Sequence, residues 1–433
     1  MIDLIIKAII IFNLVVGGIF LVCYFYQFVY VVIPFVKKAK PHKREVIHNI
    51  GILISARNEE NVIGHLIDSI NQQNYPKDKI KVFVVADNCD EGDRTADIAK
   101  QKGAIVYKRQ DKDNIGKGYA LDFLIGCIDR DLGLDSIDIF IVLDADNLLD
   151  KGYVRAMNQI YCDGYRVSTS YRNSKNYGDN WLSAAYGLWF MREARFLNNS
   201  RFLLGSSCAV SGTGFFVERK LLQELGGWKY FLLTEDIQFT TDCIVSGIKI
   251  GYCDKAMLYD EQPTTVRQSW RQRLRWSKGF FQVWSKYDKK LFRGILGGSW
   301  SCYDMTMTVC PAFLISLLSI IFDALGIVIA FLAGPPYYHY MSTLGFIILG
   351  AVGEAYILFF IMALVTLISE WKNINCRASK KISYIFMFPL FLITYMPIAL
   401  QALFSKVEWK PIAHTKSVTL DDVVGKNDSN QEK

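Results

Sequence analysis

Apolar residues are concentrated in long runs at the two ends of the chain, with shorter runs between them. Residues 4–36 and 303–405 are mostly apolar, whereas residues 45–295 have the mixed pattern of a soluble domain. A bilayer is crossed by about 20 consecutive apolar residues in a helix. The pattern therefore predicts membrane helices on both sides of a soluble domain.

The apolar runs differ in what they predict. Residues 4–36 exceed one crossing, so we expect a helix that tilts or extends past the bilayer. A cleaved signal peptide is disfavoured because the apolar core is too long and no small-residue cleavage pattern follows. Later apolar segments lie at 303–333, 341–369 and 382–404. Residues 266–296 mix Trp, Phe, Arg and Lys, which predicts an amphipathic helix on the membrane surface.

Within the soluble region, short apolar runs alternate with helical patterns. The predicted strands are 50–55, 80–86, 104–107 and 138–143, and helices are predicted at 62–70, 95–102 and 118–128. Such alternation indicates an α/β fold with a mainly parallel sheet covered on both faces. Ligands bind such sheets at the carboxyl ends of the strands. Charged residues follow three of the runs, at 57–60, 87 and 144–146, so we expect one active site assembled from several strands.

The charge distribution predicts the side of the membrane. The formal net charge is +7, and basic residues follow the first apolar run and precede the second. Basic flanks are typically cytosolic, so the soluble domain should be cytosolic and the protein a multi-pass protein of the plasma membrane. Contact with lipid explains these residues without nucleic acid. The ten cysteines form no C-x-x-C pair and the five histidines are scattered, which favours reduced thiols and no zinc site.

Asp144 and Asp146 form a D-x-D pair at the end of a predicted buried strand. Two carboxylates can hold a divalent cation that neutralises a diphosphate leaving group. Mg²⁺ suits carboxylate and phosphate oxygens, and Mn²⁺ fits nearly as well. A surface acid pair without function is the alternative, and the position at a strand end disfavours it.

Thr234, Glu235 and Asp236 precede an amphipathic pattern. The plain interpretation is a helix start, since Thr as N-cap and acids in the first turn stabilise a helix. The functional interpretation makes Asp236 the general base that deprotonates an acceptor hydroxyl. Both can hold together, because the cap would fix the carboxylate in place.

Gln272, Arg275 and Trp276 place an amide, a cation and a large aromatic ring on about one helical turn. Arg can pair with diphosphate oxygens, and Trp offers a face for a sugar ring. Anchoring at the lipid headgroups is the alternative, for which Trp270, Arg271 and Arg273 are better candidates.

Two glycine-rich segments complete the set of candidate site residues. Lys117 stands between two glycines, which would let it approach a phosphate, unless it simply begins a helix. Residues 211–214, Ser-Gly-Thr-Gly, form either a plain turn or a turn against a ligand.

D-x-D, T-E-D and Q-x-x-R-W in this order resemble the membrane-embedded, processive family 2 glycosyltransferases, which include the synthases of cellulose, chitin, hyaluronan and poly-N-acetylglucosamine. The resemblance covers residues 45–295. It implies a GT-A-like nucleotide-sugar-binding domain and inverting transfer from a UDP-sugar, which we expect to be UDP-glucose or UDP-N-acetylglucosamine. The product would be a β-linked polysaccharide, exported as it grows.

The resemblance also implies residue roles. Asp236 would be the base, and Asp144 and Asp146 would carry metal and diphosphate. The nucleotide would be held by Ala56, Arg57, Glu59, Asp87, Lys117, Thr234 and Glu235, and the diphosphate and acceptor by Gln272, Arg275 and Trp276. Family members usually show two aspartates at the second strand end, and Ala86 replaces the first of them here.

We therefore expect five parts: a membrane helix with its basic flank (1–44), a cytosolic transferase domain (45–265), interfacial helices (266–300), membrane helices forming a glycan channel (301–405) and a tail with a gating segment (406–433). Asp323 and Glu354 are hypothesised to line the channel, because acids in apolar runs usually face protein or water. A homo-oligomer or an export partner could help complete the pore.

The tail presents a conflict. Four crossings would place Trp409, Thr415 and Lys416 outside the cell, whereas the basic residues Lys406, Lys410 and Lys416 indicate the cytosol. Two further function hypotheses stay open: a membrane glycosyltransferase that adds one sugar to a lipid or short acceptor, and a non-catalytic export subunit.

Overall fold

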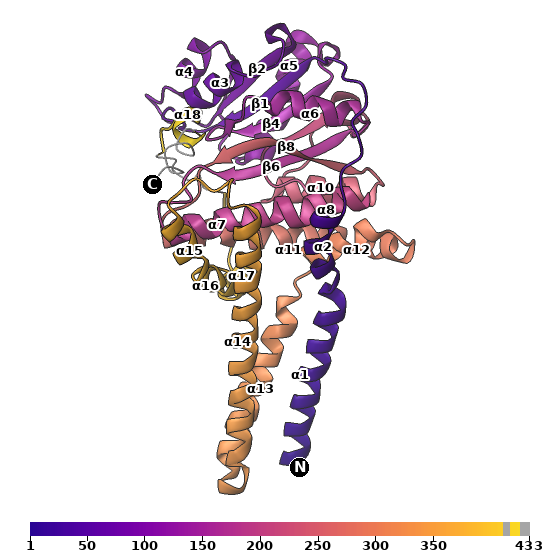
Figure 1. Ribbon diagram of the computed structural model, residues 1–433, viewed down its shortest axis with the longest axis vertical. Helices are drawn as coiled ribbons and strands as arrows, with labels where there is room; N and C mark the ends of the chain where they lie inside the picture. The colour runs from indigo at the N-terminus through magenta and orange to yellow at the C-terminus, as the bar shows by residue number, and fades with distance from the viewer. Residues whose placement is uncertain (410–415, 425–433) are drawn as a thin grey trace.

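The computed structural model describes residues 1–409 and 416–424. Figure 1 shows an α/β domain from which a bundle of long helices, formed by α1, α13 and α14, projects to one side. Both ends of the soluble domain connect to this bundle, so the domain lies at one end of the helices.

The domain is built on an eight-stranded mixed sheet with the order β3-β2-β1-β4-β7-β6-β8-β5. The strands β3, β2, β1 and β4 pair in parallel, as the alternating sequence pattern predicts. Strand β7 runs antiparallel to β4 and β6, which makes the other half of the sheet mixed. The strands are β1 (Ile50–Ala56), β2 (Ile80–Asp87), β3 (Ile105–Arg109), β4 (Ile139–Asp144), β5 (Leu148–Leu149), β6 (Val167–Ser174), β7 (Phe215–Glu218) and β8 (Ile250–Asp260).

Helices cover both faces of the sheet, because its central strands are apolar on both sides. One core cluster joins the sheet to α5, α7, α9 and α10, and a second joins it to α3, α4 and α6. The domain helices are α3 (Ile63–Asn71), α4 (Thr95–Gln101), α5 (Lys117–Leu132), α6 (Tyr153–Cys162), α7 (Trp181–Arg192), the π-helix η3 (Glu193–Asn198), α8 (Asn199–Leu204), α9 (Arg219–Glu224), α10 (Glu235–Val245) and α11 (Val266–Leu296), with 3-10 turns η1 (Lys77–Lys79) and η2 (Leu134–Ser136).

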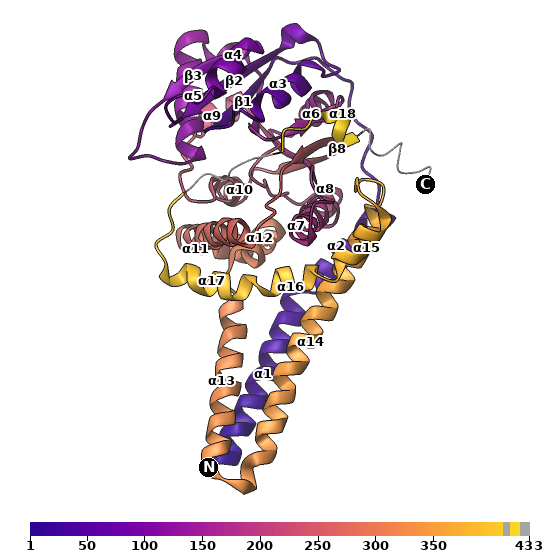
Figure 2. The same ribbon diagram turned by 90° about the vertical axis from the view of Figure 1, so that its left-hand side faces the viewer.

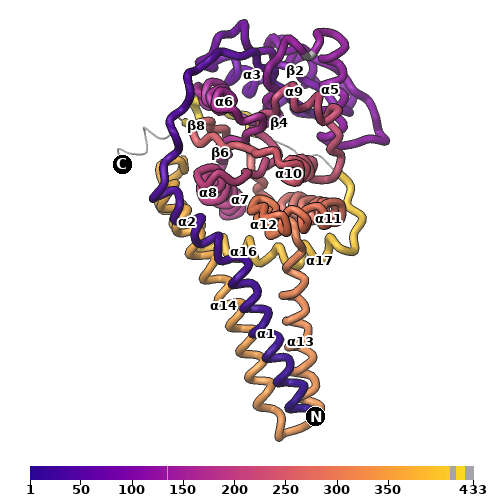
Figure 3. Tube along the Cα trace, turned by 90° about the vertical axis from the view of Figure 1, so that its right-hand side faces the viewer, coloured from indigo at the N-terminus to yellow at the C-terminus, as the bar shows by residue number. Residues whose placement is uncertain are grey.

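Among the residues that the structure describes, three helices are long and apolar enough to cross a membrane: Ile2–Val36, Phe313–Ala333 and Pro335–Ser369. The first consists of α1 (Ile2–Tyr24) and α2 (Tyr26–Val36). The others contain α13 (Phe313–Ala333) and, after the turn η4 (Pro335–Tyr337), α14 (Tyr338–Ser369). Figure 3 shows α1, α13 and α14 converging at the end remote from the domain.

The bundle is closely packed where α1, α13 and α14 meet. A Cβ on Gly326 would lie 2.6 Å from Leu344 Cδ1 and 3.0 Å from Ile9 Cδ1. Asn13 Nδ2 donates a hydrogen bond of 2.7 Å to Asp323 Oδ1, so the buried carboxylate of Asp323 is held between α1 and α13. Glu354, by contrast, is exposed on α14. The two acids therefore do not face a common interior, contrary to the hypothesis that they line one channel.

The apolar run at 303–333 is two helices, because Pro311 interrupts it. Helix α12 (Trp300–Val309) packs beside α11 and α10 at the base of the domain, and only α13 extends into the bundle. The run at 382–404 forms α15 (Ala378–Ile385), α16 (Phe388–Ile393) and α17 (Tyr395–Phe404), with a bend of 43° between Ile385 and Phe388. Figure 2 shows α16 and α17 running across the base of the domain instead of along the bundle.

Helix α17 is attached to the underside of α11. Lys278 Nζ donates to the carbonyl of Ala402 at 2.9 Å, and Trp270 Nε1 donates to Gln401 Oε1 at 2.7 Å. The chain then returns to the domain, where the short helix α18 (Leu420–Val424) packs against Leu148. The apolar run at 382–404 accordingly forms helices that cover the base of the domain. The described part of the tail lies on the same side of the bundle as the sheet.

Candidate active site

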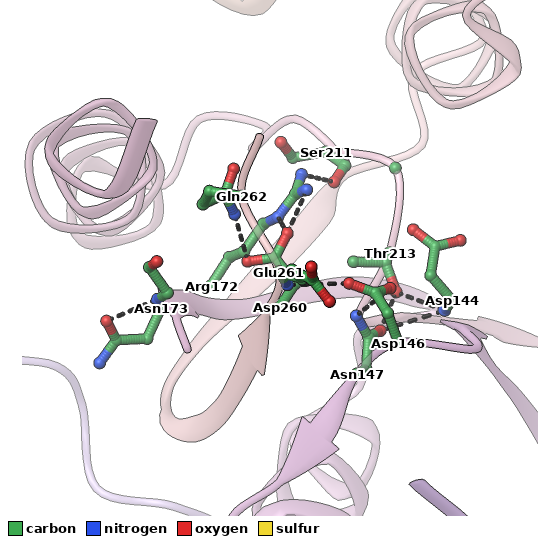
Figure 4. A network of polar contacts seen from close by, with 12 residues as sticks. Asp144, Asp146, Asn147, Arg172, Asn173, Ser211, Thr213, Asp260, Glu261 and Gln262 are labelled. Atoms are coloured by element: carbon green, nitrogen blue, oxygen red, sulfur yellow. Dashed lines mark hydrogen bonds and ion pairs between the residues drawn. The ribbon is translucent and has the colours of Figure 1, made fainter. Parts of the chain in front are cut away.

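The predicted strand ends meet at one edge of the sheet. In the register of the parallel strands, Ala56 lies opposite Ala86, and Ser55 lies opposite Asp144. The backbone N–H of Asp144 donates to Asn147 Oδ1 and Thr213 Oγ1 at 3.0 and 2.9 Å, so the D-x-D segment is fixed on a turn (Figure 4). The Ser-Gly-Thr-Gly segment therefore lies against the D-x-D segment.

Lys117 links this turn to α5. Its ammonium group forms an ion pair with Asp144 and donates to the carbonyl of Gly212 at 2.7 Å. The flanking glycine Gly118 is needed for packing, since a Cβ there would collide with the carbonyl oxygen of Tyr230. That glycine brings α5 against the segment before T-E-D.

Asp146 is buried beside a second group of charged residues. Its Oδ2 accepts a hydrogen bond of 2.8 Å from the backbone N–H of Glu261, the residue that follows β8. Asp260 at the end of β8 accepts from Arg172 Nε at 2.7 Å and from Gln262 Nε2 at 2.6 Å. Burial and the nearby charges of Asp146 and Asp144 raise the pKa of Asp260, while Arg172 opposes that rise.

Sequence reasoning missed Arg172 and Asp260. Arg172 donates through Nη1 to the carbonyl of Ser211 at 2.9 Å and so joins β6 and β8 to the Ser-Gly-Thr-Gly turn. Neither residue belongs to a motif, and they meet through the parallel pairing of β6 with β8. The only sequence feature that could have indicated this pair is the acidic residue at the end of the apolar run that forms β8.

The T-E-D segment approaches the same turn from α10. A Cβ on Gly212 would lie 3.8 Å from Asp236 Oδ2. Burial raises the pKa of Asp236, whereas the Ile237 N–H and the charges of Lys117 and Arg275 lower it. Burial and the charge of Asp236 likewise raise the pKa of Glu235. The site therefore holds a carboxylate that is more basic than an ordinary aspartate.

Thr234 precedes α10, but its hydroxyl makes no cap hydrogen bond. Its Oγ1 is buried and without a hydrogen-bond partner among the described residues, and it lies against Gly279 on α11. The prediction that a threonine cap fixes Asp236 was wrong, because α11 occupies the space beside the side chain. Packing against α11 holds this turn instead.

The Q-x-x-R-W residues lie on α11 between the T-E-D segment and α7. Arg275 Nη1 lies 3.4 Å from the carbonyl of Leu233, while the Trp276 ring makes edge contacts with Tyr186 and Phe190. Gln272 Oε1 is buried without a hydrogen-bond partner in the described part of the chain. The motif thus places the charge of Arg275 near Asp236. The guanidinium of Arg273 is used elsewhere, on Phe391 and Thr394.

The remaining predicted residues lie at the ends of β1 and β2. Arg57 Nε has no hydrogen-bond partner among the residues described, and its guanidinium lies 6.0 Å from the ring centroid of Trp409. Asp87 is buried and accepts from Arg109 Nη1 at 2.7 Å. The Glu59 N–H donates to Thr95 Oγ1 at 2.8 Å. Trp409 of the tail therefore reaches the first strand end, whereas Thr415 lies outside the described residues.

The profile of the family described as "Glycosyltransferase like family 2" matches residues 48–279, more than half of the chain. The chain belongs to glycosyltransferase family 2. This membership supports an enzyme that uses a nucleotide sugar and gives no support to the non-catalytic hypothesis. The predicted α/β fold is confirmed, and three or four apolar helices accompany it.

Curated relatives match at low identity. The probable glycosyltransferase YdaM of Bacillus subtilis is 25% identical over 56% of this chain and 58% of its own length. Beta-monoglucosyldiacylglycerol synthase of Synechocystis is 28% identical over 54% of this chain and 48% of its own. Poly-beta-1,6-N-acetyl-D-glucosamine synthase of Staphylococcus epidermidis is 24% identical over 57% and 60%. The chain thus spans about half to three fifths of these relatives.

Among solved structures, a mannosyltransferase from Pyrobaculum calidifontis in complex with GDP-Man and Mn²⁺ matches 93% of this chain and 99% of its own, with 15% identity and a TM-score of 0.54. At this identity the match shows the fold alone. It extends the likeness beyond the transferase domain to most of the helical part.

The contact between Gly279 and Thr234 yields a testable consequence for this glycosyltransferase. In Gly279→Ala, the new Cβ would lie 2.4 Å from Thr234 Oγ1, so α11 or the T-E-D turn must move. A displacement of about 1 Å can cost 10²-fold in rate, and we expect kcat to fall by about that factor. Gly126→Ala is the control, because a Cβ there meets nothing within 4 Å. Equal rates for the two variants in a sugar-transfer assay would contradict the positioning role of α11.

Proposed function

We propose that this enzyme transfers a hexose from a UDP-sugar, with inversion, to a hydroxyl group presented at the cytosolic surface of the membrane. The observation that carries the proposal is the convergence of Asp236, Lys117 and the D-x-D acids on one turn, with α11 beside them. Helix α17 lies directly beneath α11, and α16 packs against α7, so an acceptor held at the bilayer surface is close to the site.

The residues present fit a divalent cation bound together with a diphosphate. Among the described residues no three His, Cys, Asp or Glu side chains are placed to hold a metal alone. Mg²⁺ in nucleotide sites is typically held by one or two carboxylates and substrate phosphates, which matches Asp144 and Asp146. When bound, Mg²⁺ or Mn²⁺ would neutralise charge on the UDP leaving group. The chain's own cations, Lys117 and Arg275, would add to that neutralisation.

Asp236 is the proposed base. Its carboxylate would accept the proton of the acceptor hydroxyl as that oxygen attacks the anomeric carbon and the bond to UDP breaks. The raised pKa of Asp236 strengthens its affinity for this proton. Attack from the face opposite the leaving group would produce a β-linkage from an α-linked donor.

The packing of the bundle favours a single addition to a lipid or short glycan. Helices α1, α13 and α14 are in side-chain contact around Gly326, which leaves an acceptor to approach from the membrane surface. A glucosyldiacylglycerol synthase among the relatives, whose name specifies a lipid product, supports this acceptor class. We propose UDP-glucose as donor and UDP-N-acetylglucosamine as the alternative.

A processive synthase that exports a β-linked polysaccharide is the second candidate. Trp276 and the rest of Q-x-x-R-W favour it, and so does the poly-N-acetylglucosamine synthase among the relatives. This function would require a second copy or a partner subunit to form a pore with α1, α13 and α14.

We further propose three crossings, with the N-terminus outside and the transferase domain in the cytosol. Three crossings place the tail on the domain side, where Lys416 Nζ pairs with Asp179 at 2.9 Å. This arrangement removes the conflict posed by the basic tail residues.

Product length separates the two candidates. The protein in nanodiscs with Mg²⁺ or Mn²⁺ would receive radiolabelled UDP-glucose or UDP-N-acetylglucosamine, with diacylglycerol and glucosyldiacylglycerol as acceptors. We expect a lipid product one sugar longer than its acceptor, absent with EDTA and in Asp236→Asn. A long water-soluble polymer would instead establish the processive synthase, and no transfer or donor hydrolysis in any arm would contradict the proposal.

A further inference from the structure

Glu193 is an acid beside the site that no sequence motif singles out. It begins η3, where α7 changes to π-helical hydrogen bonding. Single-turn π-helices widen a helix locally and occur frequently at functional sites. At the start of this segment the carboxylate contacts the Ser-Gly-Thr-Gly turn, where Ser211 Oγ donates to Glu193 Oε2 at 3.4 Å.

Glu193 and Asp236 lie against adjacent residues of that turn. Ser211 contacts Glu193, while a Cβ on Gly212 would lie 3.8 Å from Asp236 Oδ2 and 3.9 Å from Arg172 Nη1. The two carboxylates also influence each other electrostatically. Burial raises the pKa of Glu193 and the charge of Asp236 raises it further, whereas Arg172 and Arg201 lower it. The hydrogen bond from Ser211 directs the carboxylate of Glu193 toward this turn.

Neighbouring cations are engaged by other acids. Arg172 pairs with Asp260 and its guanidinium lies 3.7 Å from the centre of the Phe190 ring, one turn before Glu193. Arg201 pairs with Asp304 at 2.7 Å. Among the described residues, Glu193 forms no ion pair within 4 Å, and the hydrogen bond that it accepts from Ser211 is long, at 3.4 Å. Glu193 therefore retains acceptor capacity for a donor group that enters the site.

We propose that Glu193 binds a second hydroxyl group of the acceptor, next to the hydroxyl that Asp236 deprotonates. The acceptor then carries more than one hydroxyl group. A sugar ring with vicinal hydroxyl groups matches two carboxylates that lie against one turn. An acceptor with a single hydroxyl, such as diacylglycerol, would leave Glu193 without a partner. This inference rests on the proposed function and narrows its acceptor from a lipid or short glycan to one that already carries a sugar. Glu193 acts as a positioning residue, and no bond to it forms or breaks.

The test compares wild type, Glu193→Gln and the control Glu224→Gln, an acid on α9 paired with Arg166. Transfer to glucosyldiacylglycerol and to diacylglycerol, hydrolysis of the donor by water, and the KM for UDP-sugar would be measured in nanodiscs. Glu193→Gln should raise the KM for the glucosylated acceptor by about tenfold, the loss expected when a charge-assisted hydrogen bond becomes neutral. Hydrolysis, donor KM and any transfer to diacylglycerol should match those of the control.

A parallel fall in hydrolysis and in transfer to both acceptors would overturn the proposal, because it would show a structural role. Binding keeps the inference testable without turnover. With UDP present, hexyl β-glucoside should bind wild type about tenfold more tightly than Glu193→Gln, and hexanol should bind both equally. Equal glucoside affinities would overturn the inference. If wild type transfers no sugar but still binds the glucoside more tightly than Glu193→Gln, only the proposed reaction is contradicted and the inference about Glu193 stands.

Discussion

Asp236→Asn is expected to lower sugar transfer by about 10²–10⁴-fold, the range that a positioned general base contributes. Asn has nearly the same shape but cannot take the proton of the acceptor hydroxyl. Because the carboxylate lies at the Gly212 turn, the variant should still bind UDP-sugar with a similar KM. Initial rates over a range of donor concentrations would separate the two effects. Asp254→Asn, at an exposed acid on β8, is the matched control.

The pH dependence of the wild type should reveal the same group. Burial raises the pKa of Asp236 above the ordinary value of about 3.9. When pH is lowered, the transfer rate should therefore begin to fall at a higher pH than it would if the base were an exposed aspartate. A rate that is flat down to pH 4, or an Asp236→Asn variant with full activity, would remove Asp236 from the role of base.

As pH is lowered, the free energy of unfolding should rise where the transfer rate falls. With a raised pKa, the folded protein holds a proton at pH values where the unfolded chain has lost it. The free energy of unfolding therefore rises as pH falls through the folded-state pKa of Asp236, and the ionised form costs stability at neutral pH. Asp236→Asn removes that cost, so its melting temperature should exceed that of wild type at pH 7, and the difference should shrink in acid.

Arg201→Ala is expected to destabilise the protein by about 3–5 kcal/mol, the cost of leaving one member of a buried ion pair without its partner. Arg201 on α8 contacts Asp304 on α12 through two hydrogen bonds of 2.7 and 2.8 Å. The same carboxylate accepts from the hydroxyls of Tyr26 and Tyr30 on α2 at 2.9 Å each. This cluster joins the first membrane helix to the base of the domain, as the position of α2 beside α8 in Figure 3 illustrates.

The measurement is thermal unfolding in detergent at fixed protein concentration. A melting temperature lower by on the order of 10 °C would agree with this cost. Arg130→Ala is the control, because its pair with Asp131 is exposed and such pairs contribute about 0–1 kcal/mol. If both variants melt at the wild-type temperature, the cluster does not connect the bundle to the domain.

The sequence by itself determined the first half of the sheet and most of the candidate site. Continuous apolar runs predicted β1, β2 and β4, because a strand buried on both faces needs apolar residues at every position. Since parallel strands end at one edge, the charged residues that follow them had to lie close together. Asp144, Asp146 and Lys117 could thus be assigned to one site, and D-x-D, T-E-D and Q-x-x-R-W indicated the family that the profile confirms.

Only the tertiary structure decided the other half of the site. Arg172, Glu193 and Asp260 meet through β6, β8 and the π-helix, whose contacts join residues far apart in the chain, and no local pattern records such pairing. The tertiary structure also decided that α16 and α17 lie across the base of the domain, because apolar length permits a crossing without specifying a direction. Contacts with α11 set that direction, and they bring the tail back to the strand edge where the site lies.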